Sequence, residues 1–528
     1  MSETAFVKHL TGLMSCLGML CVLAMPGSAQ AGSHSDLGID RLRNIYVSPL
    51  GDDGNSGSRR FPMKTIQAAV DKARPGWIIN VQRGTYRETV LFRGNADSGT
   101  AAEPITLRGE PGAKISGQGI RPRGRKGLIT IRDASHIVID GMDLRRYRTP
   151  ATFLDDATPV GILVYGTGSN ITLSNNKIRR IENRSTCTQN NNYCYPGANG
   201  IGIYGDTPGG LTDIRLIGNE VVDNTLASSE AVTLNGNIYR FRVEDNYVHD
   251  NNNIGFDFIG LEADTCPSCT DDQNRARVGL VRGNRAENNT IASNPWYAGD
   301  DGNAGGFYVD GGEYIVFEQN VSTGNDLGIE VASEARGGTS GPVLIASNLI
   351  YENRELGLAV GGYNRRVDRP GGGSAEDVWA VNNTFYANRG WGTGVVLQYR
   401  ANNFVFQNNM VYGQGGRSLS VELAEEPVGA VWDNNAWWGT GAINAIPVTD
   451  PNAVLTDPML TDVAGGDFTP LPGSPLIDTG GYVTDIVSWT DPFWTEVYGA
   501  GVIPGAGTGE VNGDAREQGV IDIGAIEQ

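Results

Sequence analysis

The chain has 528 residues, 73 of them glycine, and carries a formal net charge of −19. A chain this acidic lacks the basic face that nucleic acid or an anionic membrane needs in a general partner. The length could accommodate several domains, but the chain repeats itself internally, which is typical of one long solenoid. No long helical pattern appears outside the N-terminus, which favours short strands joined by tight turns.

The first residues are typical of a secretory signal peptide. Lys8 and His9 precede an apolar run over 10–24, and Ala29-Gln30-Ala31 offers a small-x-small cleavage site. The run is short for a membrane span, and no second apolar segment follows it. We therefore predict a signal peptide over 1–31 and a secreted or periplasmic protein that does not insert into a membrane.

The four cysteines outside the predicted signal peptide form two close pairs, Cys187 with Cys194 and Cys266 with Cys269. In an exported protein such pairs favour two local disulfides. The Cys-Pro-Ser-Cys sequence could instead be a redox motif or half a zinc site. Neither a βαβ pattern nor a nearby histidine supports those alternatives, so we predict disulfides.

The region after the predicted signal contains an expected strand over 45–49, an amphipathic helix over 65–73 and a strand over 77–81. Its most characteristic sequences are Tyr46-Val47-Ser48-Pro49, Lys64-Thr65-Ile66-Gln67 with Ala69-Val70, Pro75-Gly76 and Arg83-Gly84-Thr85-Tyr86. With these, the region resembles the N-terminal cap and first coils of bacterial secreted right-handed parallel β-helix proteins, a pectate-lyase-like superfamily of carbohydrate-active proteins that includes polysaccharide lyases and glycoside hydrolases.

The resemblance implies an all-β fold, a right-handed parallel β-helix over 45–445 with a short N-terminal capping helix. The segment 446–528 resembles the irregular C-terminal end of many such proteins, and we expect it to cover the last coil. The fold does not select a reaction, because one fold hosts many chemistries.

An asparagine returns after successive β-rich runs, and its shortest interval is 26 residues. Asparagine tolerates left-handed backbone and bonds to neighbouring amides, so stacked copies would form a ladder at one turn of the coils. Glycosylation would suit one or two asparagines at most, such as Asn289. The periodic positions are Asn176, Asn219, Asn246, Asn284, Asn320, Asn348, Asn383, Asn409 and Asn435.

A second repeat, glycine-apolar-any-apolar, begins at Gly255, Gly306, Gly328, Gly357 and Gly394. Side chains alternate between the two faces of a strand, so the apolar residues point inward and the residues between them point outward. This predicts one outward column of Asp257, Tyr308 and Glu330, with Asp310 in the neighbouring column. Earlier coils carry no acids at these positions.

Clustered carboxyl groups are typical of glycoside hydrolysis, where they lie about 5–5.5 Å apart for retention and about 6.5–9.5 Å apart for inversion. We predict Asp310 as the acid or base and Glu330 as its partner, with Asp257 and Glu334 in support. Side-chain freedom leaves the stereochemistry open. A carboxyl group near other acids and Tyr308 could keep its proton at neutral pH and act as a general acid.

Insertions over 262–277, 290–304 and 363–373 flank the acidic columns in sequence, and we expect them to wall a groove for a polysaccharide or oligosaccharide. Aromatic rings could stack on sugar faces, and arginines could bind acidic sugars. The aromatic candidates are Tyr204, Tyr308, Trp296, Tyr363 and Trp391. The arginine candidates are Arg336, Arg365, Arg366, Arg369 and Arg400.

Two alternatives to hydrolysis stay open. A polysaccharide lyase would use an arginine base, with Arg336, Arg365, Arg366 or Arg369 as candidates. It could also use Ca²⁺ held by Asp300 and Asp301 with Asp257 and Asp310; the hydrolase needs no cofactor. A non-catalytic glycan-binding surface protein would need the aromatic residues but no clustered acids.

Overall fold

The structure is a computed structural model. It describes residues 43–153, 157–190, 194–298, 302–388, 393–413, 420–439, 449–483, 489–499 and 521–526. These residues belong to a compact unit over Arg43–Gln528. The predicted signal peptide, Asp300, Asp301 and Trp391 lie outside the described residues.

Three long parallel sheets, here named A, B and C, make up the described fold. Sheet A contains β1 (Asn44–Val47), β2 (Ile78–Val81), β5 (Ile105–Gly109), β8 (Ile137–Asp140), β11 (Gly168–Ser174), β14 (Leu211–Ile217), β17 (Ile238–Glu244), β20 (Ala276–Arg282), β23 (Glu313–Glu318), β26 (Thr339–Ser340), β27 (Val343–Ala346), β30 (Ser374–Val381), β33 (Ala401–Gln407) and β36 (Val431–Asp433). Sheet B contains β4 (Val90–Arg93), β7 (Arg125–Arg132), β10 (Thr158–Tyr165), β13 (Asn199–Gly205), β16 (Val232–Gly236), β19 (Phe256–Ile259), β22 (Gly305–Asp310), β25 (Leu327–Ala332), β29 (Leu356–Val360), β32 (Thr393–Leu397) and β35 (Ser420–Leu423). Sheet C contains β3 (Gly84–Tyr86), β6 (Ala113–Ser116), β9 (Asp143–Arg148), β12 (Lys177–Glu182), β15 (Glu220–Val222), β18 (Tyr247–His249), β21 (Arg285–Glu287), β24 (Val321–Thr323), β28 (Leu349–Tyr351), β31 (Thr384–Tyr386), β34 (Met410–Gly413) and β37 (Ala436–Gly439).

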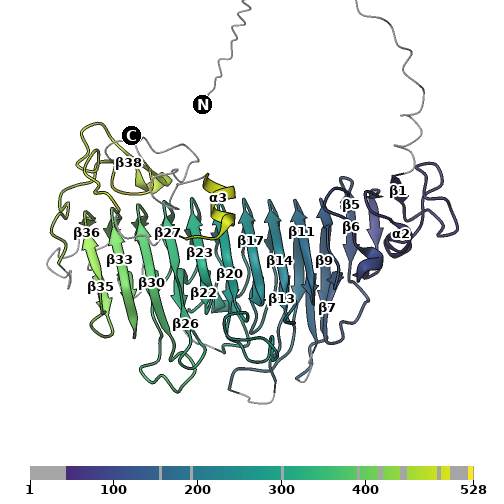
Figure 1. Cartoon of the computed structure of the whole chain (residues 1–528), viewed down its shortest axis with the longest axis horizontal. Helices are drawn as coiled ribbons and strands as arrows, with labels where there is room; N and C mark the ends of the chain where they lie inside the picture. Colours follow the sequence, from purple (N-terminus) through teal and green to yellow (C-terminus); the bar gives the residue numbers. More distant parts are fainter. Residues whose placement is uncertain are drawn as a thin grey trace, which may run out of the picture. The chain divides into compact units, whose positions relative to one another are not determined.

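Each full coil contributes one strand to each sheet in turn, as β10, β11 and β12 do before β13 returns to sheet B. The strands of successive coils lie side by side along the fold (Figure 1). Successive coils pair in parallel, and crossovers between parallel strands are right-handed in nearly all proteins. The predicted right-handed parallel β-helix is therefore confirmed. Across the described ranges, no helix has the length and apolar character of a membrane span.

Inward residues of successive coils stack on one another in the core. Phe256 and Phe307, paired in register in sheet B, stack with ring centroids 4.9 Å apart. Both rings are fully buried. Large rings buried in register stabilise the stack and fix which residues of each strand must point outward.

The predicted asparagine ladder is present in the turn between sheets A and C. The Asn219 side-chain oxygen accepts hydrogen bonds from the Asn176 backbone N–H at 3.1 Å and from its side-chain amide at 3.0 Å. The Asn219 amide donates in turn to the Leu173 carbonyl oxygen. One expectation was wrong: the left-handed residue is the one before each ladder asparagine, such as Gly218 with φ 63°. That residue turns the chain so that the asparagine side chain points inward.

A second ladder, not expected from the sequence, follows sheet C. The Asn289 side-chain oxygen accepts from the Asn251 amide at 2.9 Å, and the Asn289 amide donates to Asn325 at 2.9 Å. Asn289 is fully buried, so it cannot be a glycosylation site. This ladder contains Asn224, Asn251, Asn289, Asn325, Asn353 and Asn388.

Replacing Asn320 with alanine is expected to lower the free energy of unfolding by about 3 kcal/mol, because it leaves buried donors without acceptors. The Asn320 side-chain oxygen accepts two hydrogen bonds from Asn284, at 2.9 and 3.0 Å. Thermal unfolding measures the effect. Asn402→Ala, at a half-buried outward position of β33, is the control and should change stability little. Equal melting temperatures for the two variants would contradict a stabilising ladder.

The predicted helix is present as α2 (Ile66–Lys72), and Ile66, Ala69 and Val70 are buried. Its N-terminus is capped by Thr65, whose hydroxyl accepts from the Ala68 N–H. Both predicted disulfides form, Cys187–Cys194 and Cys266–Cys269. The capping role of α2 stays a prediction.

The C-terminal segment packs mainly along the sides of the coils. Its helix α3 (Pro492–Tyr498) buries Phe493 and Trp494 against sheet A, while a hairpin of β38 (Leu460–Asp462) and β39 (Asp467–Pro470) leads into apolar residues against sheet C. Val454 also pairs in parallel with Ala436 of the last described coil. The 3-10 turns of the described chain are η1 (Asn95–Asp97), η2 (Ile291–Ser293) and η4 (Val463–Gly465).

Candidate active site

The predicted acidic columns lie on adjacent strands of sheet B. Asp257 of β19 pairs with Tyr308 of β22, which pairs with Glu330 of β25. Asp310 pairs with Ala332, so it lies beside Glu330 with a displacement of two residues. The neighbours Phe256 and Phe258 are fully buried in the core, so the alternation that turns the carboxyl groups outward is confirmed.

These outward side chains are enclosed rather than solvated. The exposed fraction is 3% for Asp257, 6% for Asp310 and 8% for Glu330. Tyr308, between the acids, is buried as well. Glu334, just beyond β25, is exposed. The cluster therefore has a buried floor of three carboxyl groups and an exposed carboxyl group beside it.

Two further acids, Glu230 and Glu262, join this cluster and were missed by the sequence reasoning. Glu230 precedes β16, and its carboxylate accepts a hydrogen bond from the Thr233 hydroxyl at 2.6 Å. Glu262 begins the insertion after β19 and accepts from the Asn235 amide at 2.6 Å. Thr233 and Asn235 are the outward residues of β16. The sequence signal that could have revealed these acids is the pair of polar outward residues on β16. Thr233 and Asn235 each hold one of the acids toward the columns.

Burial and mutual repulsion raise the pKa values of the cluster. Burial, then the charges of Glu230 and Asp310, raises the pKa of Asp257 well above its usual range. Burial, then the charge of Glu334, raises the pKa of Asp310 in the same way and that of Glu330 to about 8. The direction is the same for all three groups because removing water and adding like charge both disfavour the ionised form.

The rim acids shift in the same direction. Burial, with an added contribution from Glu262, raises the pKa of Glu230 to about 7. Partial enclosure, then the charge of Glu262, raises the pKa of Glu334. Carboxyl groups with raised pKa values in one cluster are the arrangement from which general acids are drawn.

Hydrogen bonding distinguishes the two buried aspartates. One oxygen of Asp310 accepts the Glu334 backbone N–H at 2.6 Å, which fixes its orientation and places Glu334 next to it. Asp257 Oδ1 is buried without a hydrogen-bond partner among the described residues. A buried carboxyl oxygen without a partner favours the protonated acid or a bound ligand.

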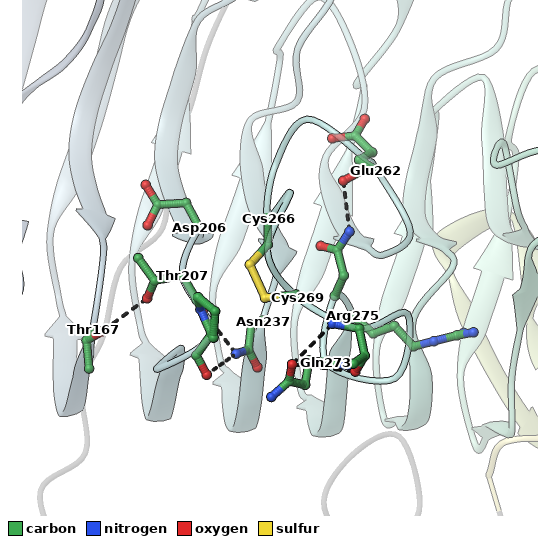
Figure 2. The surroundings of a disulfide bond; sticks show 12 residues. Thr167, Asp206, Thr207, Asn237, Glu262, Cys266, Cys269, Gln273 and Arg275 are labelled. Atoms are coloured by element: carbon green, nitrogen blue, oxygen red, sulfur yellow. Dashed lines mark hydrogen bonds between the residues drawn. A yellow bond between two sulfur atoms is a disulfide. The ribbon is translucent and has the colours of Figure 1, made fainter.

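The insertion that contains Glu262 is anchored near the cluster. Figure 2 shows the Cys266–Cys269 disulfide within this loop, with Glu262 at one end and Arg275 at the other. Arg275 donates to the carbonyl oxygens of Gly311 and Thr339, at 3.1 and 2.6 Å. These contacts join the loop to the strand ends that follow Asp310 and precede β27.

The two other insertions also approach the acids. The charges of Glu230, Glu334 and Asp257 contribute, after burial, to raising the pKa of Tyr297 to about 12. Burial, then the charges of Glu334 and Asp310, raises the pKa of Tyr363, a ring that is 47% exposed. Tyr363 is therefore a predicted aromatic residue that combines exposure with proximity to the acids. The groove walls themselves stay a prediction.

Two predicted sugar-stacking residues are packing residues instead. Trp296 is 7% exposed and packs with Cys187 and Ala227, because its insertion folds against the loop closed by the first disulfide. Tyr204 is 5% exposed, and the Arg125 guanidinium lies over its ring at 3.9 Å from the centroid. Neither ring offers a free face to a sugar. Tyr308 is buried among the acids, so it is a neighbour of the carboxyl groups and not a stacking platform.

The arginine candidates fall into three groups. Arg400 donates to the carbonyl oxygens of Asn364, Arg365 and Gly373, so it supports the 363–373 loop, and the prediction that it binds substrate is not supported. Arg366 forms an exposed ion pair with Asp368. The remaining candidates are exposed and stay predictions: Arg336, Arg365 and Arg369.

Within the described ranges, no three His, Cys, Asp or Glu side chains are placed to hold one metal ion. Asp257 and Asp310 therefore have no third metal ligand among the described residues, and Asp300 and Asp301 lie outside those residues. The calcium alternative stays a prediction.

Fold and site together define a right-handed parallel β-helix protein with a buried carboxyl cluster on one sheet. The chain belongs to the family of the uncharacterized protein YwoF of Bacillus subtilis (strain 168), with 34% identity over 452 residues that cover 82% of this chain and 91% of that protein. No protein-family model matches the sequence.

Solved structures that resemble the chain at low sequence identity include pectate lyase Pel9A, with 16% identity, a TM-score of 0.49 and coverage of 92% of this chain and 96% of that one. GH136 lacto-N-biosidase from Eubacterium ramulus has 14% identity, a TM-score of 0.46 and coverage of 80% and 68%. A rhamnogalacturonan lyase has 16% identity, a TM-score of 0.41 and coverage of 80% and 92%.

Proposed function

We propose that this protein is an exported polysaccharide-degrading enzyme that hydrolyses glycosidic bonds. The observation that carries the proposal is the set of three carboxyl groups, on Asp257, Asp310 and Glu330, buried side by side on the outer face of sheet B. Burying three acids together is unfavourable for stability, which favours a functional reason for the cluster. The two disulfides support a location outside the reducing cytoplasm.

In this proposal Asp310 is the general acid. Its raised pKa favours the protonated form, and the Glu334 N–H fixes one oxygen so that the other can present the proton. The proton moves to the glycosidic oxygen as the bond from that oxygen to the anomeric carbon breaks. The leaving sugar departs as an alcohol.

Glu334 is the proposed partner. It is exposed, and it lies next to Asp310 through its own backbone N–H. In its ionised form it would either attack the anomeric carbon or remove a proton from the attacking water. Glu330 and Asp257 would keep the local charge low, because their raised pKa values favour the protonated forms.

The proposal is tested by incubating the protein with a panel of neutral and acidic polysaccharides, with and without EDTA. Reducing ends that form without an ultraviolet-absorbing product, and independently of EDTA, are the expected result. An ultraviolet-absorbing unsaturated product would assign the protein to β-elimination, and its loss in EDTA would implicate a divalent cation. Binding without cleavage across the panel would indicate a glycan-binding protein.

A further inference from the structure

A second recess lies on sheet C and the turns that follow its strands. It has a volume of about 590 Å³, and its lining includes Arg121, Arg146, Arg148, Arg180 and Arg184. The lining residues come from β9, β12 and the turns after β6, β9 and β12. None belongs to the strands of sheet B that carry the acids.

The charge of this recess is opposite to that of the whole chain. No acidic residue lines it, whereas the chain carries a net charge of −19. The surrounding sequence is also basic: residues 121–184 hold twelve Lys and Arg against six Asp and Glu. Several guanidinium groups gathered in one lining repel one another and attract an oxyanion.

The coil repeat places two of these arginines one above the other. Arg145 pairs with Arg179, and Tyr147 pairs with Ile181, so Arg146 and Arg180 occupy equivalent positions on successive coils. Strands in a sheet lie about 4.8 Å apart. Both side chains are exposed at the recess, so they form a short row of cations along the stack.

The contacts of these arginines leave donors for a ligand. Arg148 Nη2 lies 3.4 Å from Glu182 Oε1, and Arg180 Nε lies 2.8 Å from Asp223 Oδ2. Arg146 donates to the Gln118 side chain at 3.4 Å. A guanidinium group carries five N–H donors, so one partner each does not saturate these side chains. Exposed ion pairs of this kind are weak, and a ligand can replace them.

The lining also indicates what kind of anion fits. It contains glycine, glutamine, isoleucine, threonine and proline besides arginine, and no aromatic side chain. Single-stranded nucleic acids bind largely by stacking bases on aromatic rings, which this recess cannot offer. A sugar chain with carboxylate or sulfate groups needs only the arginines and polar hydroxyl partners. The volume is within the range of small-ligand sites.

We infer that this recess is a binding site for an anionic segment of a polysaccharide, held through its carboxylate or sulfate groups by Arg146, Arg180 and their neighbours. The inference stands on its own, because binding here requires no cleavage. Combined with the proposed function, it predicts a substrate that is at least partly acidic.

The test measures binding of an oligogalacturonate, a sulfated dextran and unsulfated dextran to the full chain by calorimetry. Binding of one or both anionic probes is expected, with no binding of unsulfated dextran. The double variant Arg146→Gln/Arg180→Gln should weaken that binding about tenfold or more. The control Arg59→Gln/Arg60→Gln removes two exposed arginines elsewhere and should bind as the unchanged protein does.

Which anionic probe binds distinguishes a carboxylate site from a sulfate site. Equal binding by the double variant and the control, or binding of neither anionic probe, would overturn the inference. Single-stranded DNA that competes as well as the acidic sugars would overturn the assignment to saccharides, as would inorganic sulfate that binds as tightly as the sulfated chain. Each variant is checked by thermal melting, which should be unchanged because both side chains are exposed.

Discussion

Replacing Asp310 with asparagine is expected to reduce polysaccharide cleavage by about a thousandfold, because loss of a general acid typically removes two to four orders of magnitude in rate. The side-chain oxygen of asparagine can still accept the Glu334 N–H, so the local structure should persist. The melting temperature should not fall, since asparagine has nearly the size of aspartic acid and keeps the hydrogen bond from the Glu334 N–H. Initial rates on whichever polymer the panel identifies measure the effect.

The matched control is Glu376→Gln, at an exposed position of β30 in sheet A. This variant changes one acid to its amide on a different sheet from the acidic columns. It should cleave the polysaccharide at the rate of the unchanged protein. If Asp310→Asn retains full activity, Asp310 is not the acid. If both variants lose activity, the loss reflects charge or folding in general and not the role of Asp310.

Replacing Glu330 with glutamine is expected to stabilise the protein, and the gain should grow with pH. The folded-state pKa of Glu330 is about 8, against a usual value of 4.5. The acid therefore binds its proton more tightly in the folded state. The folded state loses relative stability as pH rises from about 4.5 to about 8, up to about 5 kcal/mol, and glutamine has no proton to lose.

Melting temperatures across this pH range measure the difference between Glu330→Gln and the unchanged protein. The difference in melting temperature should be small at the acidic end of the range and largest above the folded-state pKa of Glu330. Glu376→Gln, at an exposed site, is measured in parallel as the control for a general effect of removing one acid. A difference that shrinks as pH rises would contradict a raised pKa, because the sign of linkage would then be reversed.

The fold was predictable because its repeats are visible in the chain. The asparagine series marks the same turn in each coil, and the glycine-apolar repeat indicates which residues of β19, β22 and β25 share a face. Once the register was known, Asp257, Tyr308 and Glu330 had to form a column. Local spacing was likewise enough to pair the cysteines.

The remaining parts of the site depend on loops, which carry no repeat. Glu262 joins the cluster only because its insertion folds back onto Asn235 of β16. Trp296 is buried because another insertion packs on the loop of Cys187, a contact between distant segments that no periodic pattern encodes. The low exposure of Asp310 and Glu330 was not predictable either, because the sequence indicates an outward face but not what covers it.

The most direct test of a carboxyl-catalysed hydrolysis is digestion in water enriched in heavy oxygen, followed by mass spectrometry of the released oligosaccharides. Hydrolysis puts one oxygen atom from water on the new reducing end, so each product with a new reducing end should carry the heavy isotope. Elimination adds no water, so no product would be labelled, and each product with a new unsaturated end would be lighter by the mass of one water molecule. Labelled products from the unchanged protein, formed far more slowly by Asp310→Asn, are the predicted result; unlabelled, unsaturated products would contradict it.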